Sequence, residues 1–218
     1  MKIKWYGHAA FKITTESGVT VIIDPYQSGA FGGALSSGKI SEPADIVLST
    51  HDHDDHNYRD DIKGTYKYFN KEGNYNEMGI KIEAIPCYHD PAKGKERGNN
   101  LIFVIEADGL RLAHMGDLGH TLSDDLIKKM GKIDVILVPV GGFYTIDADE
   151  AGKVVKDLNP RITIPMHFKT PKCEFPIGGV ELFTSGKKRV TVVNEHEIEV
   201  TKDGLPEDGE IIVMKYAL

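Results

Sequence analysis

The six positions from 51 to 56 read His-Asp-His-Asp-Asp-His, and they follow directly after the short apolar run 46–48. The apolar run is typical of a buried strand, so this cluster is expected in a turn at the strand's carboxyl end. Imidazole and carboxylate groups are ligands that zinc, manganese and iron accept. A tight turn can direct alternate ring nitrogens at one ion, and Asp55 and His56 at a second. The alternative, a solvated acidic loop, requires three histidines to crowd together by accident.

The composition is typical of a globular protein and excludes several classes of partner. Hydrophobic residues make up 40% and charged residues 27% of 218 residues, which excludes a disordered chain or a coiled-coil rod. The net charge of −7 argues against nucleic acid, because phosphate binding needs a basic face. Two cysteines cannot make a disulfide scaffold, and no apolar run approaches the roughly 20 residues that span a bilayer. The start does not resemble a signal peptide, so we expect a cytoplasmic protein without a membrane partner.

Alternating or continuous apolar runs predict strands along the whole chain. In the first half they cover residues 3–5, 11–13, 19–23, 46–48, 80–85, 101–106 and 110–114. In the second half they cover residues 133–138, 162–165, 189–193 and 211–216. The Asp108-Gly109 pair predicts a hairpin between two of these strands.

Two helices and two long loops complete the predicted organisation. A helix over 122–130 has Thr121 or Ser123 near its start and ends at Gly131, and a helix over 148–158 begins after a cap at Asp147. Residues 26–43 are rich in Gly and Ser and predict a mobile loop, whereas residues 89–100 predict a polar, basic loop. No linker divides the chain, so we expect one domain over residues 1–218.

The string from His51 to His56 matches His-x-His-x-Asp-His, the signature of the metallo-β-lactamase superfamily. The family then has a His, an Asp or Cys, and a last His, and these positions resemble His89, Asp117 and His167. Asp24 after an early strand also fits the pattern. Further strings resemble the small stand-alone hydrolases related to L-ascorbate-6-phosphate lactonase; they are Tyr6-Gly7-His8 and residues 116–120, 141–145 and 165–167.

The resemblance implies an α/β fold, the four-layer αββα sandwich, with two facing sheets, helices outside and metals at one edge. It also implies two divalent ions, zinc or manganese, with iron possible. One ion would be bound by His51, His53 and His89, and the other by Asp55, His56 and His167. Asp117 would bridge the two.

The chemistry implied by such a site is hydrolysis. A bound divalent ion lowers the pKa of its water, so a metal-bridging hydroxide can attack a carbonyl carbon or a phosphorus. Asp55 would orient this nucleophile and accept its proton. Two ions supply four positive charges, and two carboxylates and a hydroxide remove three, so a net charge of about +1 favours a small anionic ester, lactone or phosphoester. Asp52 and Asp54 would favour manganese if they faced the ions.

Five side chains are candidates for substrate contact, and each has a structural alternative. Lys93 and Arg97 could hold a phosphate or carboxylate, or belong to a solvated turn. Tyr144 follows a glycine pair and could donate a hydrogen bond to the substrate, or the glycines could form a plain turn. His8 could contact a ligand or substrate or be structural. His120 could reach the mouth of the site or begin a helix.

Three other residues and two other functions complete the predictions. His114 is expected in the core or beside a ligand, and Cys87 and Cys173 are expected as small buried hydrophobes rather than zinc ligands. A non-catalytic or redox di-metal protein on the same fold is the alternative function. The redox branch typically has Glu in place of His53 and a flavin partner domain. The partner is expected to be a small molecule, and a homo-oligomer is possible.

Overall fold

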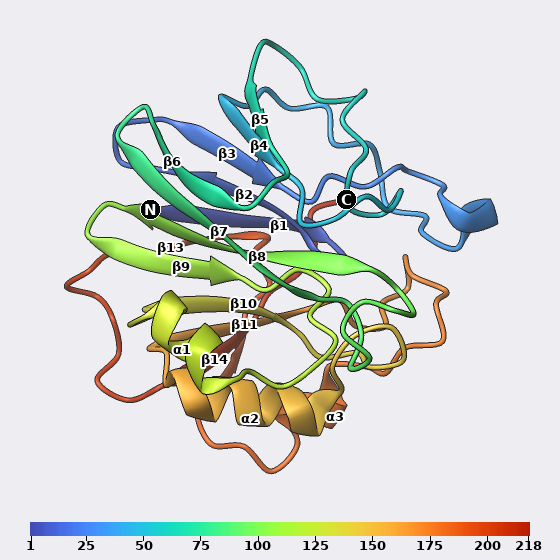
Figure 1. Cartoon of the computed structure of the whole chain (residues 1–218), viewed down its shortest axis with the longest axis vertical. Helices are drawn as coiled ribbons and strands as arrows, with labels where there is room; N and C mark the ends of the chain where they lie inside the picture. The colour runs from blue at the N-terminus through green and yellow to red at the C-terminus, as the bar shows by residue number, and fades with distance from the viewer.

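The computed structural model describes residues 1–218 and contains two β-sheets that face each other (Figure 1). The first sheet has six strands in the order β13 (Glu197–Glu199), β1 (Lys2–Gly7), β2 (Ala10–Thr14), β3 (Thr20–Ile23), β4 (Ile46–Leu48) and β5 (Lys67–Phe69). The second has eight, in the order β12 (Val190–Val192), β14 (Glu210–Val213), β11 (Ile162–Met166), β10 (Val135–Pro139), β9 (Leu110–His114), β8 (Asn99–Ala107), β7 (Ile80–Tyr88) and β6 (Gly73–Glu77).

The main hydrophobic core fills the space between the two sheets. Along β1, Ile3 and Trp5 belong to this core, whereas Tyr6 belongs to a second cluster on the sheet's other face. This alternation is the period-two pattern of a strand. The Trp5 ring lies 5.3 Å from that of Phe168, which follows β11, so it joins the two sheets.

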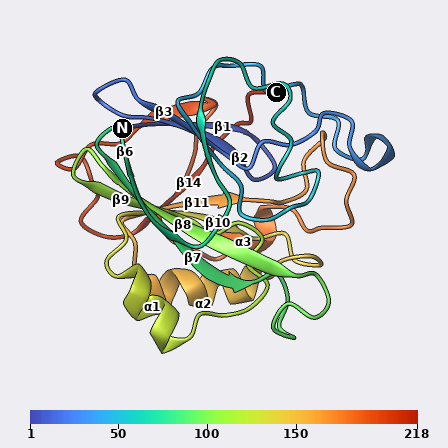
Figure 2. The ribbon, with the colours of Figure 1, turned by 45° about the horizontal axis from the view of Figure 1, so that its top comes forward.

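Helices cover only the outer face of the eight-stranded sheet, as Figure 2 shows. Helix α1 (Asp124–Met130) contacts β7, and α2 (Ala148–Leu158) contacts β10 and the short α3 (Glu181–Thr184). Strand β10 is therefore buried on both faces, which explains its continuous apolar sequence. The predicted α/β sandwich of two facing sheets is confirmed, with helices on one of its two outer faces.

The layer outside the six-stranded sheet consists of loops and one 3-10 turn, η1 (Phe31–Gly33), instead of helices. Its cluster of 13 buried residues includes Tyr26, Leu35 and Ile40 from the predicted loop 26–43. Glycine and serine make this segment a poor helix former, yet its few apolar side chains are enough to hold it on the sheet. The segment is a loop, as predicted, with an apolar underside.

The predicted helix caps and hairpin are present. The Ser123 side chain caps α1, and Asp147 and Glu150 form a reciprocal capping box at the start of α2. Strands β5, β6 and β13 were not predicted, because they are short, polar and at or near sheet edges, where one face is solvated. Both cysteines are unpaired and buried, and none of the helices is long and apolar enough to cross a membrane.

Candidate metal centre

The predicted donor residues all lie just after the carboxyl ends of strands. Strands β3 and β4 are parallel, and so are β9, β10 and β11, so their carboxyl ends meet at the same edge of the sandwich. The turn 51–56 follows β4, His89 follows β7, and Asp117 and His167 follow β9 and β11. The topology therefore brings residues more than 100 positions apart to one edge.

Three overlapping groups of donor atoms form there, and within each group the atoms lie within 4.8 Å of one another. The groups are His51, His53 and His89; His51, His56 and Asp117; and His8, Asp55, His56 and His167. The first and third match the two predicted ligand sets, and the third adds His8. Asp117 lies between them: its carboxylate is 3.2 Å from His89 Nε2 and 3.4 Å from His167 Nε2.

Several of these atoms are buried without a hydrogen-bond partner. They include His51 Nε2, His56 Nε2 and Asp117 Oδ1. His56 Nε2 and Asp117 Oδ1 are 3.2 Å apart, but not in hydrogen-bonding geometry. An unpartnered buried polar atom costs about 1–3 kcal/mol, so several at one point indicate a site built for a ligand. Imidazole nitrogens and carboxylate oxygens at this spacing fit divalent ions.

The charge states at the site suit cations. Burial, together with the neighbouring charge of His56, lowers the pKa of His51 to about 3, so its imidazole is neutral and can donate a lone pair. Burial raises the pKa of Asp117, but the charges of His167 and His56 outweigh it and hold the pKa well below the ordinary value. Burial lowers the pKa of His56, but Asp117 and Asp55 raise it well above the ordinary value. The carboxylates therefore favour positive charge at this point.

Asp24 orients two of the histidines. Its carboxylate accepts hydrogen bonds from His56 Nδ1 (2.8 Å), from the backbone N–H of Thr50 (2.8 Å) and from the Thr50 hydroxyl (2.8 Å). The Thr50 oxygen in turn lies 3.0 Å from His51 Nδ1. When Nδ1 of each ring donates, Nε2 is left as the acceptor facing the site. The sequence pattern indicated Asp24, but not Thr50.

Asn100 positions Asp117 from the other side and was not predicted. The Asn100 side chain is fully buried; its Nδ2 donates to the Met115 carbonyl (2.9 Å) and to Cys87 Sγ (3.1 Å), and its Oδ1 accepts from the Asp117 backbone N–H (3.0 Å). Gly116 makes this approach possible, because a Cβ there would lie 2.3 Å from Asn100 Oδ1. Cys87 is thus a buried structural residue in this network.

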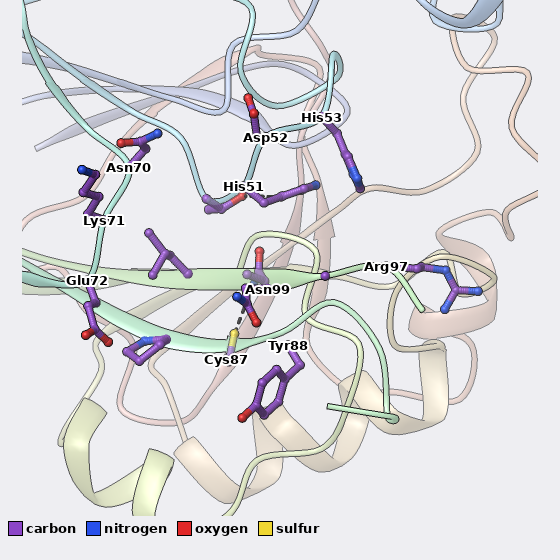
Figure 3. A pocket seen from close by; sticks show the side chains of 15 residues that line it. His51, Asp52, His53, Asn70, Lys71, Glu72, Cys87, Tyr88, Arg97 and Asn99 are labelled. Atoms are coloured by element: carbon purple, nitrogen blue, oxygen red, sulfur yellow. Dashed lines mark hydrogen bonds between the residues drawn. The ribbon is translucent and has the colours of Figure 1, made fainter. Parts of the chain in front are cut away.

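Two cavities adjoin the donor groups. One of about 300 Å³ is lined by five donor residues, by Glu96, Arg97 and Tyr144, and by two phenylalanines; the donors are His53, Asp55, His89, Asp117 and His167. The other, of about 640 Å³, is polar and extends past His51 between β7 and the segment 70–72 (Figure 3). Both include His53 and Arg97, so these two residues stand where the cavities meet.

Arg97 faces the cavities because a buried aspartate folds its loop. The Asp90 carboxylate accepts backbone N–H groups of Gly94 (3.0 Å), Glu96 (3.1 Å) and Arg97 (2.8 Å). Burial raises the pKa of Asp90, but these hydrogen bonds outweigh it and lower the pKa below the ordinary value. Asp90 was not predicted, because a single aspartate in a polar loop gives no distinctive signal.

The remaining substrate candidates do not line either cavity. Lys93 is exposed. His120 is held in its turn by the Thr121 carbonyl (2.8 Å) and by the Tyr88 N–H (3.2 Å). His8 is buried behind Asp55, with Nε2 3.1 Å from Asp55 Oδ2.

Three other predictions concerned residues near the cluster. His114 is a core residue whose Nε2 lies 2.8 Å from the Ala9 carbonyl. Asp52 and Asp54 are exposed and belong to none of the donor groups. The argument for manganese required both aspartates to face the ions, so it no longer applies.

Comparison with known proteins agrees with this geometry. Residues 2–167 match the family model described as the β-lactamase superfamily domain. A UPF0173 metal-dependent hydrolase from Thermococcus onnurineus is 33% identical over 196 residues, which cover 78% of this chain and 85% of the relative. One from Pyrococcus abyssi is 31% identical over 195 residues, with the same coverage.

A solved structure matches almost the whole chain. It is that of a Thermotoga maritima protein to which a Zn-dependent hydrolase activity of the metallo-β-lactamase superfamily has been ascribed. Its TM-score is 0.83 at 33% identity, and the match covers 99% of each chain. The ordered donor residues, the facing sheets and these similarities lead to one conclusion: this chain belongs to the metallo-β-lactamase superfamily.

Proposed function

We propose that this protein is a dinuclear metal-dependent hydrolase that cleaves a small anionic ester, lactone or phosphoester. The observation that carries the proposal is the convergence of seven donor side chains at one point, where buried atoms such as His51 Nε2, His56 Nε2 and Asp117 Oδ1 lack a hydrogen-bond partner. The curated relatives are named metal-dependent hydrolases, which supports the same reaction class. The sequence resemblance to the lactonase-related branch is the reason to include lactones among the substrates tested.

The ligand assignment follows the donor groups. His51, His53 and His89 would hold one ion, and Asp55, His56 and His167 the other. Asp117, which lies between the groups, would contact both. The donor set suits zinc, manganese or iron. When bound, two such ions make hydroxide available near neutral pH and polarise a substrate oxygen.

The chain's own residues provide positioning and proton transfer. His8 lies 3.1 Å from Asp55 Oδ2, which fixes the carboxylate at the edge of the small cavity. Asp55 can therefore orient the nucleophile and accept its proton. Arg97, which lines the same cavity, supplies a positive charge for the anionic part of the substrate. Tyr144 lines the same cavity.

The test compares two neighbouring aspartates. Asp55 is buried among the donors, whereas Asp54 is exposed and belongs to no donor group. Protein loaded with zinc or manganese is assayed against lactones, phosphodiesters and phosphorylated sugars, and its metal content is measured. We expect about two ions per chain, turnover of at least one class, and a loss of about 100-fold or more in Asp55→Asn but not in Asp54→Asn.

Two results would contradict the proposal. One is a metal content well below one ion per chain that does not rise on adding zinc or manganese. The other is unchanged turnover in Asp55→Asn. Full metal binding without turnover of any class would favour a non-catalytic metal-binding protein.

A further inference from the structure

Part of the wall of the small cavity is aromatic. It consists of Phe31, Tyr144 and Phe175, which we call the aromatic wall. The ring of Phe175 lies 5.3 Å from that of Phe31 and 5.8 Å from that of Tyr144, and both pairs meet edge to face. These residues come from three separate segments, so the wall is a tertiary feature.

Backbone hydrogen bonds hold two of these segments together. The Ser36 N–H donates to the Lys172 carbonyl (2.8 Å), and the Glu174 N–H donates to the Ala34 carbonyl (2.7 Å). Phe31 and Phe175 are therefore carried by loops that are fastened to each other. The positions of these two aromatic residues are therefore fixed by backbone hydrogen bonds.

Phe31 is largely exposed and has an unfavourable backbone conformation, although its ring contacts Phe175. Its side chain is 54% exposed, and its backbone has φ 54°, in the left-handed region that bulky residues rarely adopt. An exposed phenylalanine in a strained conformation suggests a functional constraint. The exposed part of the Phe31 ring therefore offers apolar surface to a ligand that enters the cavity.

The size and charge of the cavity limit the occupant. About 300 Å³ accommodates a benzene-sized ring, for which roughly 150 Å³ suffices, together with one carboxylate- or phosphate-sized group. Arg97 lies on the wall, and its Nη1 is 3.7 Å from the carboxylate of Glu96, which lines the same cavity. Both side chains are partly exposed, and an exposed ion pair is weak, so the guanidinium can also attract an anion. The cavity thus combines an apolar side for a ring with a cationic side for a negative charge.

We infer that the aromatic wall is a binding subsite for a flat apolar group, such as a phenyl ring, carried by the anionic substrate of the metal centre. The inference rests on the proposed function, because it takes the donor groups to be where the substrate's ester or phosphoester reacts. It narrows the substrate class to small anions that bear an aromatic or similarly flat group. Polar anions without such a group would bind less tightly.

The experiment measures the binding of two simple monoanions, benzoate and acetate, to zinc-loaded protein by ligand-observed NMR titration. Both carry the same carboxylate, so the difference in affinity reports the ring. We expect benzoate to bind at least about fivefold more tightly. In Phe31→Ala, the benzoate affinity falls by about the same factor, and the acetate affinity, which checks that the site is intact, is unchanged.

Phe143→Ala is the matched control. Phe143 is also exposed (62%) with φ 64°, and its ring contacts Tyr144, but it does not line the cavity. We expect its benzoate preference to equal that of the wild type. Equal affinities of the wild type for both anions, or the same loss in Phe31→Ala and Phe143→Ala, would overturn the inference.

Two further outcomes are distinguishable. Acetate binding without a preference for benzoate overturns the aromatic subsite alone, whereas no zinc-dependent binding of either anion overturns the proposed metal centre as well. Light scattering gives the mass of the wild type and of Phe31→Ala, which we expect to be equal. A wild-type oligomer that dissociates in Phe31→Ala would show that a second copy covers Phe31, and would also overturn the inference.

Discussion

Gly116 is the position at which one added methyl group should disturb both the fold and the donor groups. Its φ is +56°, and a Cβ there would lie 2.3 Å from Asn100 Oδ1 and 2.8 Å from Thr50 Cγ2. Gly116→Ala therefore combines a left-handed alanine, which costs about 1–2 kcal/mol, with overpacking, which costs about 1–3 kcal/mol. The free energy of unfolding should fall by about 2–5 kcal/mol.

The same substitution should also weaken metal binding, because both displaced residues orient donors. Asn100 holds the Asp117 backbone N–H, and the Thr50 hydroxyl contacts His51 Nδ1. Loss of such supporting contacts typically costs 10- to 100-fold in metal affinity. The free energy of unfolding is measured by urea denaturation with a chelator present, and zinc affinity by competition with a chromophoric chelator.

Gly79→Ala separates the two contributions. Gly79 also has a positive φ (+82°), but a Cβ there would have no neighbouring atom within 4 Å. We expect this variant to lose only the backbone contribution, about 1–2 kcal/mol, and to bind zinc like the wild type. If Gly116→Ala and Gly79→Ala lost the same free energy of unfolding and bound zinc equally well, the close packing of Gly116 against Asn100 and Thr50 would have no effect on stability or metal binding, and the prediction would be wrong.

Three further predictions concern the donor set and one surface cluster. Asp24→Asn should lower zinc affinity about 10- to 100-fold, because it weakens the acceptor for His56 Nδ1; unchanged affinity in a competition titration would refute this role. Removing metal with a chelator should lower the melting temperature. Adding zinc at 100 times its dissociation constant should then raise the free energy of unfolding by about 2.7 kcal/mol. A melting curve that responds to neither the chelator nor zinc would contradict the presence of a metal site. Burial raises the pKa of Glu42, but hydrogen bonds from Lys4 and Lys12 outweigh it and lower the pKa to about 2. Glu42→Gln should therefore destabilise the protein at pH 7 by at most about 1 kcal/mol, since the pair is partly exposed, and the difference should shrink as the pH falls below the unfolded value of 4.5 towards 2; a difference that grows on acidification would contradict this.

The part of the site that could be predicted from the sequence is the part formed by neighbouring residues. The turn 51–56 is a contiguous pattern directly after a buried strand, so its position at a strand end followed from a short stretch of sequence. His89, Asp117 and His167 are single residues that only the family order singled out. The structure brings them to the same edge, because parallel strands end together.

The unpredicted part depends on contacts between distant segments. Asn100 is one of two adjacent asparagines at a strand start, and nothing in that pair reveals its hydrogen bond to the Asp117 backbone. His8 lies 47 positions from Asp55, and its contact with that carboxylate depends on how β1 and β4 are arranged. The aromatic wall likewise depends on the fastening of two loops whose sequences show no regular period.

The fold shows the same division. Strand β10 is buried at all five positions and has a continuous apolar sequence that predicts it. Strand β6 reads Gly-Asn-Tyr-Asn-Glu and pairs only with β7, so its backbone hydrogen bonds rather than its side chains define it. Sequence patterns report burial, and an exposed edge strand has little of it.

The most direct test of the central claim is the anomalous difference density at the zinc absorption edge in crystals of zinc-loaded protein. We expect two peaks. One should lie among His51, His53 and His89, and the other among Asp55, His56 and His167, with the Asp117 carboxylate between them. No peak at this edge of the sandwich, or ions held by other side chains, would contradict the assignment on which the proposed chemistry depends.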